Sequence, residues 1–287
     1  MTAGIGAKLL FSSQNYADSG TYSENNVSPQ EWSDALSLNN LKDRQLTKVA
    51  RSLTLSPDFI VDLGRNQTIT FFALLAHNLT ISGQWRIIVS RDSDFSTEEY
   101  NSGFVDIWPT TQTIGSLPWG GFAWNGKAQS DDANKGILIL SSAVFGRYIL
   151  VSLSDATNSA GYLQAGRFIV DSPWRPTYSV QYGWGVGFSQ RSRKVRSRGG
   201  QVWGDEQAEY RTLSFNLAGI GEDEIYGQAY EIDRRRGSLG DVLAIIDPSD
   251  LANRHKYTIY GTQATLGPTT HRTHKDFSHP FVIEESL

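Results

Sequence analysis

Short runs of β-favouring residues, each closed by turn-forming residues, most constrain how this chain can fold. The runs at 85–90 and 147–153 are rich in Val, Ile, Leu and aromatic residues, and Gly, Asn, Asp and Ser separate such runs along residues 1–172. These residue types suit a pleated sheet, and strands alternating with helices are not indicated. The pattern therefore predicts a mainly-β fold, with a jelly-roll β-sandwich in residues 1–172. A Ser28-Pro29-Gln30-Glu31 capping box adds one predicted short helix at 29–36.

A proline pair divides the chain. Pro173 and Pro176 fix their own φ angles and push the preceding residues into extended conformations, which is typical of a linker. We therefore expect domains at 1–172 and 173–287. In the second, residues 210–217 alternate apolar and polar, as a strand with one buried face does. Residues 222–236 begin acidic, end basic and precede Gly237, which predicts one helix in a smaller β-rich domain.

Charge and composition exclude several classes of function. The chain has no cysteine, so it has neither disulfides nor thiolate metal sites. Its formal net charge is −4, from 26 basic and 30 acidic residues, and this does not favour general nucleic-acid binding. No apolar run approaches the ~20 residues that span a bilayer, so we expect no membrane insertion.

Catalytic motifs are not found in the sequence. There is no Gly-x-Ser-x-Gly elbow and no phosphate-binding lysine loop, so we expect no enzyme and no cofactor. His271, His274 and His279 with Asp276 could share a metal on a helix, but Pro268 and Pro280 argue against a helix there. The alternative, which we favour, is a solvated polar arm.

The first half resembles the discoidin-like (galactose-binding-like) domains. The resemblance is carried by Asp58-Phe59-Ile60-Val61-Asp62-Leu63-Gly64 with His77-Asn78, and by Gly146-Arg147-Tyr148-Ile149-Leu150-Val151 with Asp155, Asn158 and Gly161-Tyr162. It spans residues 10–172 and implies a β-sandwich. The disulfide between the domain ends of the animal members is missing here.

The second half resembles phage tail proteins of the distal-tail or baseplate kind. The matching residues are Arg198-Gly199-Gly200-Gln201-Val202-Trp203, Arg211-Thr212-Leu213-Ser214-Phe215, Gly240-Asp241-Val242-Leu243 and Phe281-Val282-Ile283-Glu284-Glu285. The resemblance implies a virion structural protein, made in the host cytoplasm, that forms a three- or six-fold homo-oligomeric ring with tail tube and baseplate proteins as partners. A glycan-binding module for host-surface attachment is the alternative function.

A basic run at 191–198 is the sharpest local feature. It contains Arg191, Arg193, Lys194, Arg196 and Arg198. These cations repel one another unless an anionic surface faces them. We interpret the run as an assembly interface whose partner is the acidic end, Glu284-Glu285, of another copy. DNA in a tail lumen and a solvated loop are the two other interpretations.

A Gly-, Asn- and Trp-rich stretch at 117–135 supplies the candidate ligand-binding residues. Trp119, Trp124 and Asn125 combine aromatic rings with an amide, which suits the faces and hydroxyls of a host-surface glycan. The alternative is that both rings close the end of the sandwich as part of its core.

Overall fold

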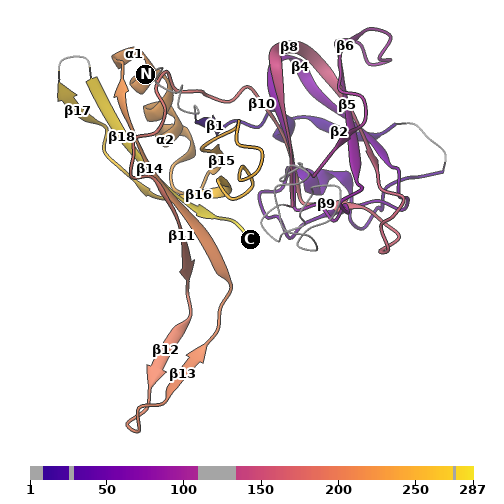
Figure 1. Cartoon of the computed structure of the whole chain (residues 1–287). Helices are drawn as coiled ribbons and strands as arrows, with labels where there is room; N and C mark the ends of the chain where they lie inside the picture. The colour runs from indigo at the N-terminus through magenta and orange to yellow at the C-terminus, as the bar shows by residue number, and fades with distance from the viewer. Residues whose placement is uncertain (1–8, 26–28, 109–133, 274–275) are drawn as a thin grey trace, which may run out of the picture. The chain divides into compact units, whose positions relative to one another are not determined.

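The computed structural model describes residues 9–25, 29–108, 134–273 and 276–287, which form two compact units. We call Gln14–Pro173 with Ser249–Lys256 the sandwich unit. The β-rich unit consists of Met1–Ser13, Trp174–Pro248 and Tyr257–Leu287. Both units are built mainly from strands, and the long helical stretch among the described residues lies in the β-rich unit (Figure 1). The predicted fold class is confirmed.

The sandwich unit is organised around one curled sheet. Its strand order is β10-β4-β8-β5-β6, with β2 beside β4 and β7 beside β5. A separate pair joins β3 to β9. The elements are η1 (Tyr16–Asp18), β2 (Thr21–Glu24), η2 (Leu38–Lys42), β3 (Ala50–Arg51), β4 (Asp58–Leu75), β5 (Gln84–Ser90), β6 (Glu98–Asn101), β7 (Val105–Asp106), β8 (Lys135–Ser154), β9 (Gln164–Ala165) and β10 (Arg167–Asp171).

The two longest strands, β4 and β8, pair with each other and bend together. Their register shifts between Asp62 and Gln67, and again between Ile69 and Phe71. Gly64 lies in the first shift with a φ of +76°, a conformation that glycine adopts without steric cost. Irregularities of this kind increase the local twist and curl the sheet. The sequence signals a turn at Gly64, and the structure continues one strand through that bend.

Aromatic rings fill the interior of the sandwich unit. Phe59 lies edge-on to Trp32 and to Phe168, with ring centroids 5.6 Å apart in each pair. Trp85 and Trp108 are buried in the same core cluster. Burial of such rings is the largest single apolar contribution that side chains can make, and it needs no disulfide.

The predicted helix at 29–36 is wrong. Trp32 forms a β-bridge with Ser52 instead. The Glu31 carboxylate, which a capping box would turn back on its own helix, accepts a 2.7 Å hydrogen bond from the backbone N–H of Asp58. A partner distant in sequence therefore replaces the local cap.

The β-rich unit has a sheet of order β1-β15-β16-β18-β14-β11, with β17 beside β18. A two-stranded ribbon, β12–β13, continues from β11 and β14. The strands are β1 (Leu10–Ser12), β11 (Gly185–Gln190), β12 (Arg193–Arg196), β13 (Val202–Asp205), β14 (Glu209–Ile220), β15 (Asp241–Ile245), β16 (Thr258–Leu266), β17 (Thr270–Thr273) and β18 (Asp276–Glu285).

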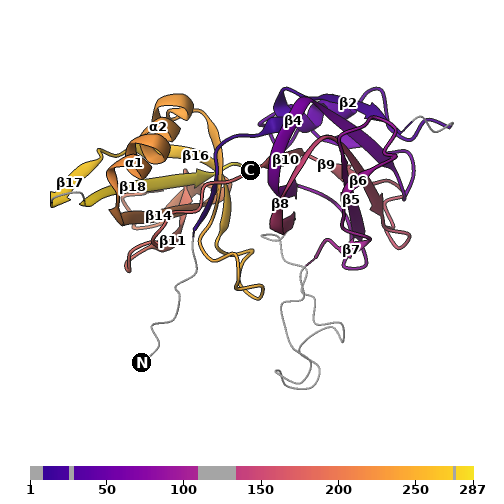
Figure 2. The same ribbon diagram turned by 90° about the horizontal axis from the view of Figure 1, so that it is seen from above.

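One helical stretch covers a face of this sheet (Figure 2). It runs through α1 (Glu222–Glu224), the π-helical turn η4 (Ile225–Ala229) and α2 (Tyr230–Arg236), as the sequence predicts. Its inner side buries Ile225, Ala229 and Ile232 in the core of the unit. Gly237, with a φ of +55°, ends the helix.

Residues 14–173 of the sandwich unit are an insertion in the β-rich unit, and residues 249–256 are a second, shorter one. The predicted domain 1–172 assigns the first residues to the sandwich, whereas β1 pairs with β15 of the β-rich unit. Phe11 and Trp174 form a further bridge on either side of the inserted residues. A three-residue strand gives no local indication of a partner more than two hundred residues away, so the pairing of β1 could not be predicted from sequence.

Candidate functional site

The ribbon beyond β11 and β14 projects from the β-rich unit (Figure 1). We call residues 191–208 the arm. Its strands β12 and β13 pair in the register Arg193↔Asp205, Lys194↔Gly204, Val195↔Trp203 and Arg196↔Val202. Every residue of β12 and β13 is exposed. The arm therefore has no sheet or helix packed on either of its faces among the described residues.

The basic run lies on this arm. Arg193, Lys194 and Arg196 belong to β12, and Arg198 lies in the tight turn that follows. None of these four cations forms an ion pair with a described residue. Arg191, at the base of the arm, lies 3.9 Å from Glu284 and over the ring of Tyr210. The structure thus places four of the five predicted interface cations on a surface where no described residue pairs with them.

Apolar side chains accompany these charges. Val195 and Trp203 are cross-strand partners, 51% and 67% exposed, and Arg193 and Asp205 are the next pair on the same face. Val202 is exposed on the opposite face. Exposed aromatic and basic side chains together are typical of protein–protein interfaces, where Trp and Arg are enriched among the residues that dominate affinity.

The acidic end, Glu284-Glu285, was predicted to face the basic run of another copy, but both residues lie beside arginines of their own chain. Glu285 accepts hydrogen bonds from Nε and Nη2 of Arg211 in its own chain, and both side chains are largely buried. The cause is the pairing of β14 with β18, whose register Thr212↔Glu284 brings Arg211 beside Glu285. The Glu285 carboxylate is therefore paired within its own chain and is not offered to another copy. Glu284 lies near Arg191 of the same chain.

The candidate ligand residues Trp119, Trp124 and Asn125 lie outside the described residues. The structure brings together another group that the sequence does not signal. Arg51 on β3 lies over the Tyr162 ring, 4.1 Å from its centroid, and its Nη2 donates a 3.1 Å hydrogen bond to Gln164 Oε1. The pairing of β3 with β9 and the hydrogen bonds between Ser52 and Leu163 join these segments, so no local pattern could have revealed them.

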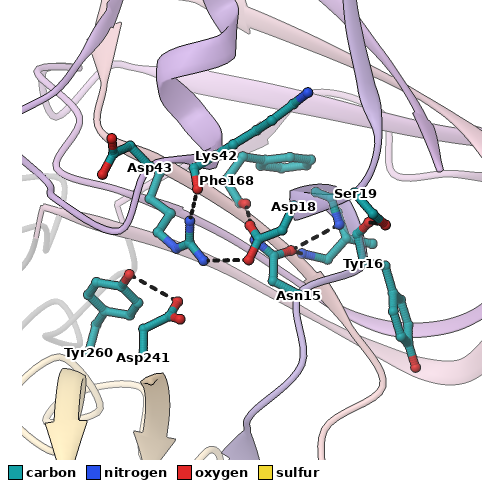
Figure 3. A network of polar contacts seen from close by, with 12 residues as sticks. Asn15, Tyr16, Asp18, Ser19, Lys42, Asp43, Phe168, Asp241 and Tyr260 are labelled. Atoms are coloured by element: carbon teal, nitrogen blue, oxygen red, sulfur yellow. Dashed lines mark hydrogen bonds and ion pairs between the residues drawn. The ribbon is translucent and has the colours of Figure 1, made fainter. Parts of the chain in front are cut away.

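A polar network joins the first residues of the sandwich unit to its last strand, β10 (Figure 3). The fully buried Arg167 donates to the Lys42 carbonyl at 2.6 Å and to Asp18 Oδ2 at 2.9 Å. Asn15 donates to the Phe168 carbonyl and accepts from the backbone N–H of Val170, each at 2.9 Å. These contacts hold the first residues of the sandwich unit against its last strand.

His77 is a buried histidine without a hydrogen-bond partner among the described residues. Its ring lies edge-on to Trp108, with centroids 5.5 Å apart. Burial lowers the pKa of His77 to about 3, and the negative charge of Asp155 opposes this only in part. The imidazole is therefore neutral at physiological pH.

In the histidine cluster near the C-terminus, His271 on β17 is exposed, as the predicted polar arm requires, and His279 is not. His279 is buried, with Nδ1 3.0 Å from Thr269 Oγ1 and Nε2 3.1 Å from Asp233 Oδ2. His271 stacks on Phe277 instead, and His274 lies outside the described residues. Within the described ranges, no group of three His, Asp or Glu residues could hold a metal ion. No helix of the described chain is long and apolar enough to cross a membrane.

Comparison with known proteins gives matches among solved structures. No protein-family model and no curated protein sequence matches the chain. A fucose-binding module from Streptococcus pneumoniae is 13% identical, covers 55% of this chain and 98% of its own, and has a TM-score of 0.35. A chitosan-binding module from Paenibacillus sp. IK-5 is 15% identical, covers 55% and 99%, and has a TM-score of 0.36.

A third module comes from Clostridium perfringens and was solved with GalNAc-β-1,3-galactose. It is 10% identical, covers 55% of this chain and 100% of its own, and has a TM-score of 0.38. At such identities and TM-scores, neither the ligand nor the function of these modules carries over to this chain.

Proposed function

We propose that this chain is a non-catalytic structural component of a phage tail tip or baseplate, which forms a symmetric ring of three or six copies through its β-rich unit. The arm is the observation that carries this proposal. It carries four cations that pair with no described residue, and an exposed Val195–Trp203 pair, on a ribbon whose faces no described element covers. A two-stranded ribbon is only marginally stable in water, and it gains stability when a partner covers it.

The connectivity of the two units supports the same role. The sandwich unit is inserted where Phe11 bridges Trp174, so the sheet of the β-rich unit is completed by residues on both sides of the insertion. An assembly platform can therefore carry the sandwich without interrupting its own core. We place such a ring in the virion, next to tail tube and baseplate proteins.

Light scattering combined with particle images tests the proposal. Purified chain is expected to form one closed oligomer of defined mass, and the images should show a ring. Because the arm is cationic, the oligomer should dissociate as salt is raised, since screening is strong above about 0.1 M. A chain that stays monomeric at every concentration and at low salt contradicts the proposal.

Carbohydrate binding by the sandwich unit is a second candidate function, favoured by Arg51, Tyr162 and Gln164. A guanidinium, an amide and a half-buried aromatic ring meet there, and such groups hydrogen-bond and stack against sugars. A glycan array tests it. Arg51→Ala should abolish a sugar-dependent signal that the exposed Arg65→Ala leaves intact, and the absence of any such signal for the native chain contradicts this function.

A further inference from the structure

The outer face of the helix at 222–236 matches the arm in chemistry. Its inner residues are buried, whereas Glu222, Asp223, Tyr226 and Tyr230 are exposed. Tyr226 and Tyr230 are each 48% exposed and touch edge to face, with centroids 6.2 Å apart. Glu222 and Asp223 form no ion pair with a described residue. We call these four residues the helix face.

The arm and the helix face lie at opposite ends of the same unit (Figure 1). The arm joins β14 at Glu209, and the helix begins directly after β14 ends at Ile220. A twelve-residue strand spans roughly 40 Å at about 3.3 Å a residue. The two surfaces of one chain therefore do not meet, and a contact between them requires a second copy.

We propose that the arm of one copy docks on the helix face of the next copy. This inference rests on the proposed ring assembly and names its two surfaces. Lys194 and Arg196 supply positive charge where Glu222 and Asp223 supply negative charge. Val202 lies on the same face of the arm as these two cations and supplies apolar surface where the two tyrosines expose their rings. Cations also interact favourably with such aromatic faces.

The geometry of this contact agrees with a ring. Each copy gives an arm at one end and receives an arm at the other, so the interface is heterologous. Head-to-tail interfaces of this type close into rings when the rotation between copies permits, and otherwise extend into filaments. An isologous dimer would instead pair one surface with itself, which the like charge on the arm opposes.

Charge reversal tests the docking. A Lys194→Glu/Arg196→Glu chain and a Glu222→Lys/Asp223→Lys chain should each associate roughly 100-fold more weakly than the native chain, because like charges then face each other. A chain with all four substitutions should recover association, because the charge pattern is exchanged. Mass measured by light scattering across a dilution series gives the association constants.

Controls separate docking from general effects. Arg65→Glu reverses an exposed charge in the sandwich unit and should associate like the native chain. Circular dichroism and thermal unfolding check that each variant is folded. Val202→Ala should weaken association roughly threefold, because it removes apolar surface beside Lys194 and Arg196. Trp203→Ala changes the opposite face of the arm and should associate like the native chain.

The outcomes distinguish this inference from the proposed function. If the native chain forms rings and the charge-reversed arm assembles normally, the docking is overturned and the ring stands. If the reversed arm fails but the four-substitution chain does not recover, the arm is an interface and the helix face is not its partner. If the native chain is monomeric, both proposals are overturned.

Discussion

Phe11 and Trp174 each donate a backbone hydrogen bond of 2.9 Å to the other, although residues 12–173 separate them in the chain. Chain ends that meet in this way allow a domain to be inserted without breaking the core that receives it. Residues 14–173 are consequently an addition to a sheet whose strands all belong to the β-rich unit.

Removal of the insertion should leave a folded β-rich unit. If Ser13 is joined to Trp174 by a short glycine linker in place of residues 14–173, β1 can still reach β15. We expect a cooperative thermal transition and a β-type circular dichroism spectrum. A shortened chain that is unfolded at 25 °C would show that the β-rich unit depends on the sandwich.

Arg167 should be a major determinant of sandwich stability. Its fully buried guanidinium bonds to Asp18 and to the Lys42 carbonyl. Arg167→Met should lower the free energy of unfolding by about 2–4 kcal/mol, because it removes one partner of a buried network. Arg91→Met is the matched control, since Arg91 pairs with Glu99 at the surface and should change stability by less than about 1 kcal/mol. Urea titration of both variants gives the comparison, and equal effects would contradict it.

Buried His77 should make the protein sensitive to acid. Its folded pKa of about 3 lies below the unfolded value of 6.5, so below pH 6.5 the unfolded state binds a proton that the folded state does not. This contribution to stability is complete above pH 6.5 and is lost as pH falls toward 3, by up to about 1.4 kcal/mol per pH unit.

A His77→Phe variant isolates this effect. It keeps an aromatic ring beside Trp108 and removes the titrating group. Between pH 6 and pH 4, the unfolding free energy of the variant should fall less steeply than that of the native protein. Parallel curves would mean that His77 is solvated or hydrogen-bonded in solution.

Local signals predicted the parts of the fold that local chemistry determines. The helix at 222–236 was predicted because its acidic start, basic end and terminal glycine are all contiguous. The strand at 85–90 was likewise predicted within one residue of β5. The helix expected at 29–36 did not form because Glu31 found a tertiary partner in Asp58.

The candidate site also contains features that local sequence predicts and features that depend on contacts between distant residues. The basic run could be recognised from sequence because its cations are neighbours in the chain. The ion pair of Glu285 could not be predicted from sequence, because Arg211 reaches Glu285 only through the pairing of β14 with β18. Arg51 and Tyr162 come together for the same reason, through strands too short to predict. The helix face also emerges only once the buried side of the helix is known.

Gly261 should be the least replaceable glycine in the β-rich unit. A Cβ at this position would lie 1.8 Å from the Glu284 carbonyl oxygen, so β16 and β18 would have to move apart. Gly261→Ala should therefore lower the free energy of unfolding by about 2–4 kcal/mol, as a forced shift of packed backbone does. The same shift would disturb the adjoining Arg211–Glu285 pair.

Gly185→Ala is the matched control, because a Cβ there meets no atom within 4 Å and Gly185 lies in the same sheet. It should change stability by less than about 1 kcal/mol. Thermal unfolding of both variants, measured on protein with a native-like circular dichroism spectrum, gives the difference. If Gly261→Ala were as stable as Gly185→Ala, β16 and β18 would be further apart in solution than their pairing here requires.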